Sequence, residues 1–204
     1  MGAVLVALLL AGCGFGSFQR PAPTAVWLGL DAPPPSGGLR AGGPTLQVLP
    51  FSTATPFRTD RLAAKTGKDL WAFSHYHRWV AEPGDLVTAS AARFFARCDL
   101  FGAVTSAGSP FEPEYRLGGS VHELYWDRTE GRVVLEVEAS LVAYPSTFRG
   151  FWIRRAAVPV PGNDIAALPA AAGAALDQVL SELRKDLAAS LAQAPSEIGA
   201  TGQL

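Results

Sequence analysis

Two histidines and a serine lie together in the aromatic stretch LWAFSHYHRW, residues 70–79. The aromatic residues predict a β-strand, and a strand places residues two positions apart on the same face. His75 and His77 could therefore share a metal ion, but no Cys, Asp or Glu stands beside them at a ligand spacing. The alternative is the polar face of an aromatic strand, which needs no metal. We favour this alternative and predict no metal site.

The sequence offers little else for catalysis. Ser74 precedes His75, but adjacent residues of a strand point to opposite faces and cannot form a nucleophile–base pair. Glu136 and Glu138 would share one strand face, where carboxylates are more often solvated than catalytic. The segment GKD at residues 67–69 lacks the spaced glycines and the hydroxyl residue of a phosphate-binding loop. We predict that the protein is not an enzyme, with no catalytic residues and no cofactor.

The clearest chemistry belongs to the thiol of Cys13, which follows the apolar run AVLVALLLA at residues 3–11. A run of this length is too short for a transmembrane helix, which needs about 20 residues, but suits the hydrophobic region of a signal peptide. The ending LAGC, residues 10–13, resembles a bacterial lipobox, although residues 1–12 contain no Lys or Arg. We predict a lipoprotein signal peptide at residues 1–12. The alternative is a buried apolar segment that ends in a core cysteine.

Acylation of Cys13 would attach diacylglycerol and a further chain such as palmitate, and two or more chains anchor a protein stably. Gly14 stands where an Asp would favour the inner membrane, so we expect an outer-membrane anchor facing the periplasm. The formal net charge is −1 and charged residues make up 17% of the chain. This balance argues against nucleic acid as a partner. Cys98, the other cysteine, is predicted to be a small buried side chain.

Proline, glycine and alanine dominate residues 13–44, which predict an extended tether. Within it, AVWLGL at residues 25–30 is compatible with an edge strand. The folded domain is predicted at residues 45–195 and a flexible tail at residues 196–204.

The domain alternates strand and helix patterns. Strands are predicted at 45–50, 57–67 and 70–79, then a helix from Pro83 with Asp85 as its N-cap, strands at 114–127, 132–144 and 148–160, and a helix at 164–194. The order β-β-β-α-β-β-β-α predicts an α+β domain of two layers, with two helices packed on one face of a mostly antiparallel sheet. Aromatic residues on these strands are expected to be exposed and to contact a partner: Trp71, Phe73, Trp79, Trp126, Phe151 and Trp152.

Several stretches follow one another in an order found in a known family: the LAGC ending, LQVLPF, LAAKTGKDLWAFSHYHRWVAEPGDLVTASAARFF, YRLGGSVHELYWD, FRGFWIRRAAVPV and the helix after GND. In this order and spacing the chain resembles the ABC-type transport auxiliary lipoproteins, the PqiC-like family. The segment RWVAEP, which contains Arg78, Trp79, Glu82 and Pro83, carries the strongest part of the resemblance.

The resemblance implies a non-enzymatic lipoprotein that accompanies an MCE-domain protein and an ABC permease and ATPase in lipid transport between membranes. It would act by protein contact, and a homo-oligomer remains open. The alternative is an envelope assembly lipoprotein for another machine, such as one for lipopolysaccharide, pilus assembly or secretion.

The RWVAEP segment has two interpretations. As a structural corner, Trp79 packs between a strand and the helix that Pro83 opens, while Arg78 pairs with Glu82. As a docking site, the same four residues bind the partner.

Overall fold

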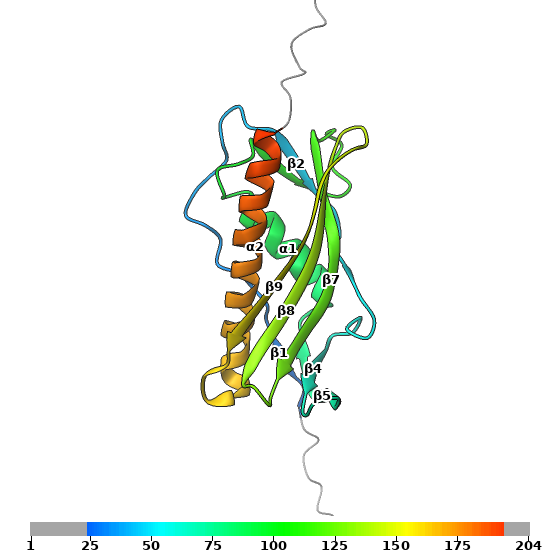
Figure 1. Ribbon diagram of the computed structural model, residues 1–204, viewed down its shortest axis with the longest axis vertical. Coiled ribbons are helices and arrows are strands. Elements are labelled where there is room, and N and C mark those ends of the chain that lie inside the picture. The colour runs from blue at the N-terminus through cyan, green and yellow to red at the C-terminus, as the bar shows by residue number, and fades with distance from the viewer. Residues whose placement is uncertain (1–23, 194–204) are drawn as a thin grey trace, which may run out of the picture.

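The computed structural model describes residues 24–193 and has two layers, a long twisted sheet and two helices (Figure 1). Within these residues nine strands form one mixed sheet, so the chain has the predicted α+β fold. No helix in this part of the chain is long and apolar enough to cross a bilayer.

The backbone of the sheet is an antiparallel meander of three long strands. β7 spans Tyr115–Asp127, β8 spans Arg132–Ala143 and β9 spans Thr147–Pro159. Each pairs antiparallel with the next over almost its whole length. Alternate residues of β8, from Val133 to Leu141, are fully buried, as expected of an antiparallel strand with one face on the core.

The other edge of β7 is shared by three short strands, each running parallel to it. β2 (Thr45–Val48), β3 (Ser52–Thr53) and β4 (Arg61–Lys65) pair with successive parts of β7 from its start to its end. Outside them, β6 (Ala103–Ser106) pairs parallel with β2, β5 (Trp71–Trp79) pairs antiparallel with β4, and β1 (Val26–Leu28) pairs parallel with β5.

The prediction of a mostly antiparallel sheet is therefore only partly confirmed. The longest pairs are antiparallel, but five of the eight strand pairs in the described residues are parallel. Four of the parallel pairs join strands that lie before and after the first helix, and parallel strands require such a crossover. The fifth, between β1 and β5, joins strands separated by the segment that contains β2, β3 and β4. The sequence patterns also missed β3 and β6, which are too short to show a period.

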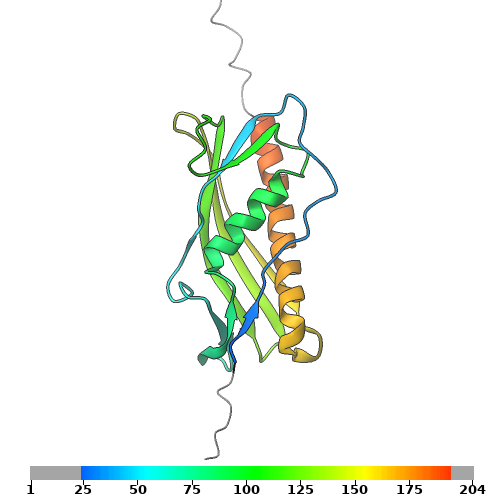
Figure 2. The ribbon, with the colours of Figure 1, turned by 180° about the vertical axis from the view of Figure 1, so that it is seen from behind.

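Both helices cover the same face of the sheet (Figure 2). α1 spans Pro83–Phe95 and α2 spans Leu168–Ala192, preceded by the short 3₁₀ turns η1 (Pro161–Asn163) and η2 (Ile165–Ala167). The buried residues of both helices join the inward face of β8 in one hydrophobic core. The prediction of two helices on one face is confirmed.

The first turn of α1 is capped from another strand. Glu82 occupies the N-cap position without a side-chain hydrogen bond, and Pro83 is the first helical residue. The free N–H of Gly84 donates instead to the hydroxyl of Thr53 in β3, at 2.9 Å. The prediction of Asp85 as the N-cap is wrong, because Pro83 begins the helix two residues earlier than the acid.

Residues 24–44 follow a packed path along the domain rather than the extended tether that composition suggested. Leu28, Leu30 and Ala32 are buried in the main core. The carbonyl oxygen of Asp31 lies so close to α2 that a Cβ on Gly173 would meet it at 2.4 Å. These three apolar side chains alternate with Gly29 and Asp31, but the alternation covers only five residues in a stretch otherwise rich in glycine and proline, so it did not predict a packed path. The rest of the predicted tether lies outside the described residues.

A second, smaller apolar cluster lies on the outer face of the sheet. Phe57, from the loop after β3, packs with Ala63, Tyr125 and Val134, and Phe73 borders them. Trp71 joins this cluster, with its ring centroid 5.8 Å from that of Phe57 and 4.8 Å from that of Tyr125. The cluster fixes the β4–β5 hairpin against the end of β7.

Candidate functional site

Trp79 ends β5 and its side chain is only 1% exposed. It belongs to the main core together with Val87 and Ala91 of α1. The backbone N–H of Trp79 also donates to the carbonyl of Asp60, at 2.6 Å. This burial favours the structural-corner interpretation, because a partner cannot reach the indole without opening the core.

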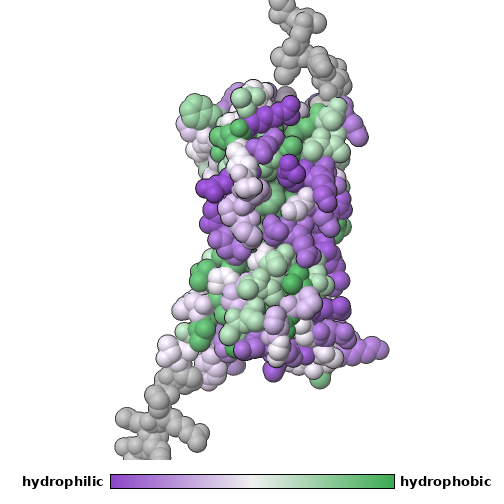
Figure 3. Space-filling view, turned by 90° about the vertical axis from the view of Figure 1, so that its left-hand side faces the viewer, coloured by the Kyte–Doolittle hydropathy of each residue, from purple (hydrophilic) through white to green (hydrophobic). Residues whose placement is uncertain are grey.

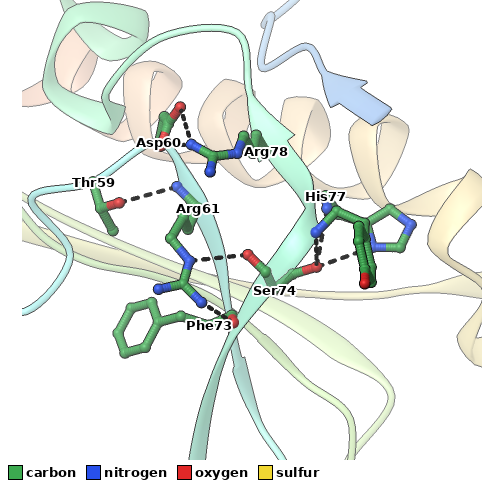
Figure 4. Close-up of polar contacts among 8 residues, drawn as sticks. Thr59, Asp60, Arg61, Phe73, Ser74, His77 and Arg78 are labelled. Atoms are coloured by element: carbon green, nitrogen blue, oxygen red, sulfur yellow. Dashed lines mark hydrogen bonds and ion pairs between the residues drawn. The ribbon is translucent and has the colours of Figure 1, made fainter. Parts of the chain in front are cut away.

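Arg78 contacts a different acid from the one predicted. Its Nη1 lies 3.0 Å from both carboxylate oxygens of Asp60, in the loop before β4 (Figure 4). Glu82 is exposed and Pro83 is buried at the helix start. The predicted pair between Arg78 and Glu82 is replaced by the Arg78–Asp60 pair, since the strand pairing of β5 with β4 brings Asp60 closer. No pattern in the sequence identified Asp60 as the partner of Arg78.

The middle of β5 leaves the regular ladder. Arg78 pairs with Arg61 and Phe73 with Ala63, so the residues between Phe73 and Arg78 bulge out from the sheet. The Oγ of Ser74 accepts the N–H groups of Tyr76 and His77, at 3.3 and 2.9 Å. This bulge removes the alternation that placed His75 and His77 on one face.

The Arg61 guanidinium holds the base of the bulge (Figure 4). Its Nε donates to the carbonyl of Ser74 at 3.0 Å, and its Nη2 donates to the carbonyl of Phe73. Because the β4–β5 register shifts between Arg61 and Ala63, the guanidinium supplies hydrogen bonds at the start of the bulge that backbone groups of a regular ladder would supply.

The bulge brings Ser74 and His77 together, with Ser74 Oγ 3.2 Å from His77 Nδ1. A nucleophilic serine needs a base that is itself oriented by a third group. Within residues 24–193, His77 makes no hydrogen bond to a carboxylate, and the serine oxygen already accepts two backbone N–H groups. The contact is that of a side-chain-capped turn. No cluster of three or more His, Cys, Asp or Glu side chains that could hold a metal occurs among the described residues.

A shallow pocket of about 440 Å³ lies between β4, β5, the end of β7 and the η1–η2 segment. Its wall is mainly apolar and includes Leu62, Ala64 and Ile165, while Ser74 and His77 stand at its side. Arg128 lies over the ring of the buried Trp126, at 5.1 Å from its centroid. The pocket offers room for an apolar group but no convergent set of reactive side chains.

Of the two cysteines, only Cys98 lies within the described residues. Cys98 is buried, its Sγ donates to the carbonyl of Phe95 at 3.2 Å, and burial raises the pKa of its thiol. A neutral buried thiol is inert, in agreement with a packing role. Cys13, the predicted lipidation site, lies outside the described residues.

The aromatic residues of the strands divide into buried and exposed groups. Trp79 and Trp126 are core residues, which corrects their assignment to an exposed contact surface, whereas Trp71 and Phe151 are exposed. The strand patterns did not single out other exposed apolar side chains, which include Trp27, Leu70, Phe111 and Phe148. Period alone could not separate the two groups on β5, because this strand is exposed or half-buried over most of its length and is buried only at Trp79, where it ends.

Solved structures with the same fold include protein XCC0632 from Xanthomonas campestris, of the DUF330 family model. It has 21% identity and a TM-score of 0.72, over 83% of this chain and 98% of that one. An uncharacterized protein follows, with 11% identity and a TM-score of 0.65, over 80% and 99% of the two chains. PelC from Paraburkholderia phytofirmans, solved as a dodecamer, has 18% identity and a TM-score of 0.42, over 73% and 92%.

No curated protein matches this sequence. The family model described as "ABC-type transport auxiliary lipoprotein component" matches residues 29–184, which is more than half of the chain. The matched region begins just after β1 and includes α1, the complete meander and α2 up to residue 184. The chain therefore belongs to the ABC-type transport auxiliary lipoprotein family.

Proposed function

We propose that the protein is a lipid-anchored periplasmic lipoprotein, held in the outer membrane through Cys13, that serves as the auxiliary component of an ABC- and MCE-type system for lipid transport between membranes. The family match over residues 29–184 carries this proposal. The apolar run before Cys13, which suits the hydrophobic region of a lipoprotein signal peptide, supports an anchor of acyl chains on Cys13. The protein would act by contact with the MCE-domain protein and its permease and ATPase, without catalysis.

The edge strand β9 is the surface we assign to that contact. In the described residues β9 pairs only with β8, so the other edge of this thirteen-residue strand pairs with no strand. Such an edge can accept a strand from a partner. Phe148, Phe151 and Ile153 stand exposed along it and lie on the face opposite α2.

An ion pair and a hydrogen bond hold α2 against the opposite face of β9. The Arg154 guanidinium binds the carboxylate of Asp186 through two hydrogen bonds, of 2.9 and 2.6 Å. The hydroxyl of Ser190 donates to the carbonyl of Arg149 at 3.2 Å. Because α2 is fixed behind the strand, the outward side chains of β9 remain free for a partner.

A pull-down from detergent-solubilised envelopes tests the role, with the lipidated protein as bait and mass spectrometry as the readout. We expect an MCE-domain protein, its permease and its ATPase. Recovery of proteins for lipopolysaccharide, pilus assembly or secretion instead would replace the transport role with the envelope-assembly alternative.

Two variants of the bait then test the surface. Phe151→Ser should lower recovery of the MCE-domain protein, whereas Phe111→Ser, a matched change in the loop before β7, should not. Equal recovery with both variants would show that the β9 edge is not the contact, without affecting the transport role.

A further inference from the structure

Exposed apolar side chains gather at the end of the molecule where the described chain begins. We name this the β4–β5 end and define it by Thr24, the hairpin tip Thr66–Leu70 and the β7–β8 turn Arg128–Gly131. Leu70 at the tip is 65% exposed and Trp71 beside it 45%. Trp27 on β1, 56% exposed, lies farther from the tip, opposite Arg78 of β5. On the side of the molecule that lies to the left in Figure 1, Figure 3 shows a hydrophobic band across the lower part, with more hydrophilic residues above and below it.

We propose that the β4–β5 end is a membrane-docking surface, whose exposed apolar side chains enter the interface of the bilayer that holds the lipid anchor. This inference rests on the proposed acylation of Cys13. The occupant is the phospholipid surface itself rather than a protein.

The length of chain between the anchor and the domain supports this occupant. Eleven peptide units join Cys13 to Thr24, and a fully extended chain of that length spans at most about 40 Å. β7 runs along the molecule for thirteen residues, which at about 3.3 Å each is roughly 43 Å. To bring the opposite end to the membrane, the whole connecting chain would have to be extended along the domain. The β4–β5 end meets the bilayer without that cost in chain entropy.

The side chains at this end are suited to a bilayer interface. Trp and Tyr are enriched at the level of lipid headgroups, where one part of the ring is apolar and another is hydrated. Trp71 is held in place by its edge contacts with Phe57 and Tyr125, so its exposed part is presented without further ordering. The hairpin tip is closed by the N–H of Thr66, which donates to the carbonyl of Leu70 at 2.9 Å.

Charge at this end is nearly balanced. Cations and carboxylates alternate there: Lys65, Lys68, Asp69, Asp127, Arg128, Glu130 and Arg132. The carboxylate of Asp127 is buried and accepts the N–H groups of Thr129 and Glu130, at 3.1 and 3.0 Å. With four cations against three carboxylates, we expect docking to depend on the apolar side chains and to be insensitive to salt.

Spin labels on the full lipidated chain in phospholipid vesicles test the inference. Leu70→Cys carries the label at the β4–β5 end, and Phe111→Cys carries it in the exposed loop before β7, at the opposite end. An acylated Cys13 and a buried Cys98 leave only the introduced thiol to react. We expect the Leu70→Cys label to collide more with oxygen, which dissolves in lipid, and several-fold less with a water-soluble nickel complex than the Phe111→Cys label.

The outcomes separate the anchor from the surface. Mass spectrometry of Cys13 and flotation of the chain with vesicles report the anchor. An acylated, floating chain with equal nickel collisions at both positions would overturn the docking surface and leave the anchor intact. A label at Leu70→Cys that stays in water until a transport complex is added would also overturn it, in favour of a protein partner. A chain that is not acylated and does not float would refute both.

Discussion

Replacement of Trp79 by alanine separates the two interpretations of the RWVAEP segment. The indole is 1% exposed and packs in the core beside α1. A buried Trp removes about 200 Å² from water, and at about 25 cal/mol per Å² this corresponds to roughly 5 kcal/mol. Measured Trp→Ala changes in cores cost about 3–5 kcal/mol. We expect Trp79→Ala to lower the free energy of unfolding by about 4 kcal/mol.

A loss of this size is large for a domain with a total stability of about 5–15 kcal/mol. For a chain of this length it should lower the melting temperature by about 10 °C. Urea denaturation followed by far-UV circular dichroism measures the change without relying on the fluorescence of the residue removed. Trp27→Ala is the matched control, because that indole is largely exposed, and its effect should stay below about 1 kcal/mol.

Arg78→Ala completes the test, because Arg78 lies on the same corner but its pair with Asp60 is partly exposed. We expect it to cost at most about 1 kcal/mol. If Trp79→Ala unfolds with the free energy of the unmodified chain and yet fails to recover partners in the pull-down, the packing argument is refuted and the segment is a docking site.

Two further predictions concern close packing and the buried thiol. Gly119→Ala would place a Cβ 2.0 Å from the carbonyl oxygen of Glu138 and should lower the free energy of unfolding by about 1–3 kcal/mol. Gly29→Ala, with open space around it, should leave that free energy unchanged. Equal urea midpoints for the two variants would contradict this prediction. Burial raises the pKa of Cys98 above its ordinary value of 9.0, so the unfolded chain loses the thiol proton first. The free energy of unfolding should then be unaffected by this thiol below pH 9 and fall as the pH rises above it, less steeply in Cys98→Ala. In the native protein a thiol reagent should react with Cys98 only on unfolding, and rapid native labelling would contradict the assignment.

The strands and helices with strong periodic patterns could be predicted from the sequence. The alternation in β8 and the leucine spacing in α2 each report the face on which a side chain is buried, and local sequence is sufficient for that. Short elements without a full period, such as β3 and β6, gain their order from the strands beside them. The path of residues 24–44 was missed as well, since it depends on three buried side chains, Leu28, Leu30 and Ala32, whose alternation covers only five residues.

At the corner, the residue types were identifiable but their partners were not. The pattern located Arg78, Trp79, Glu82 and Pro83, yet the ion pair with Asp60 depends on how β5 pairs with β4. The contact between Ser74 and His77 depends on a bulge, which breaks the alternation that the sequence argument assumed.

The sequence by itself determined the alternation of strands and helices, the α+β class and the order of segments typical of the family. Those features follow from local periods and turn residues. Only the tertiary structure decided that three short strands pair parallel with β7, that Trp79 is buried while Trp71 is exposed, and that the described chain starts at the β4–β5 end. Each of these depends on contacts between segments far apart in the chain, whose register and burial are set by the packing of the whole domain.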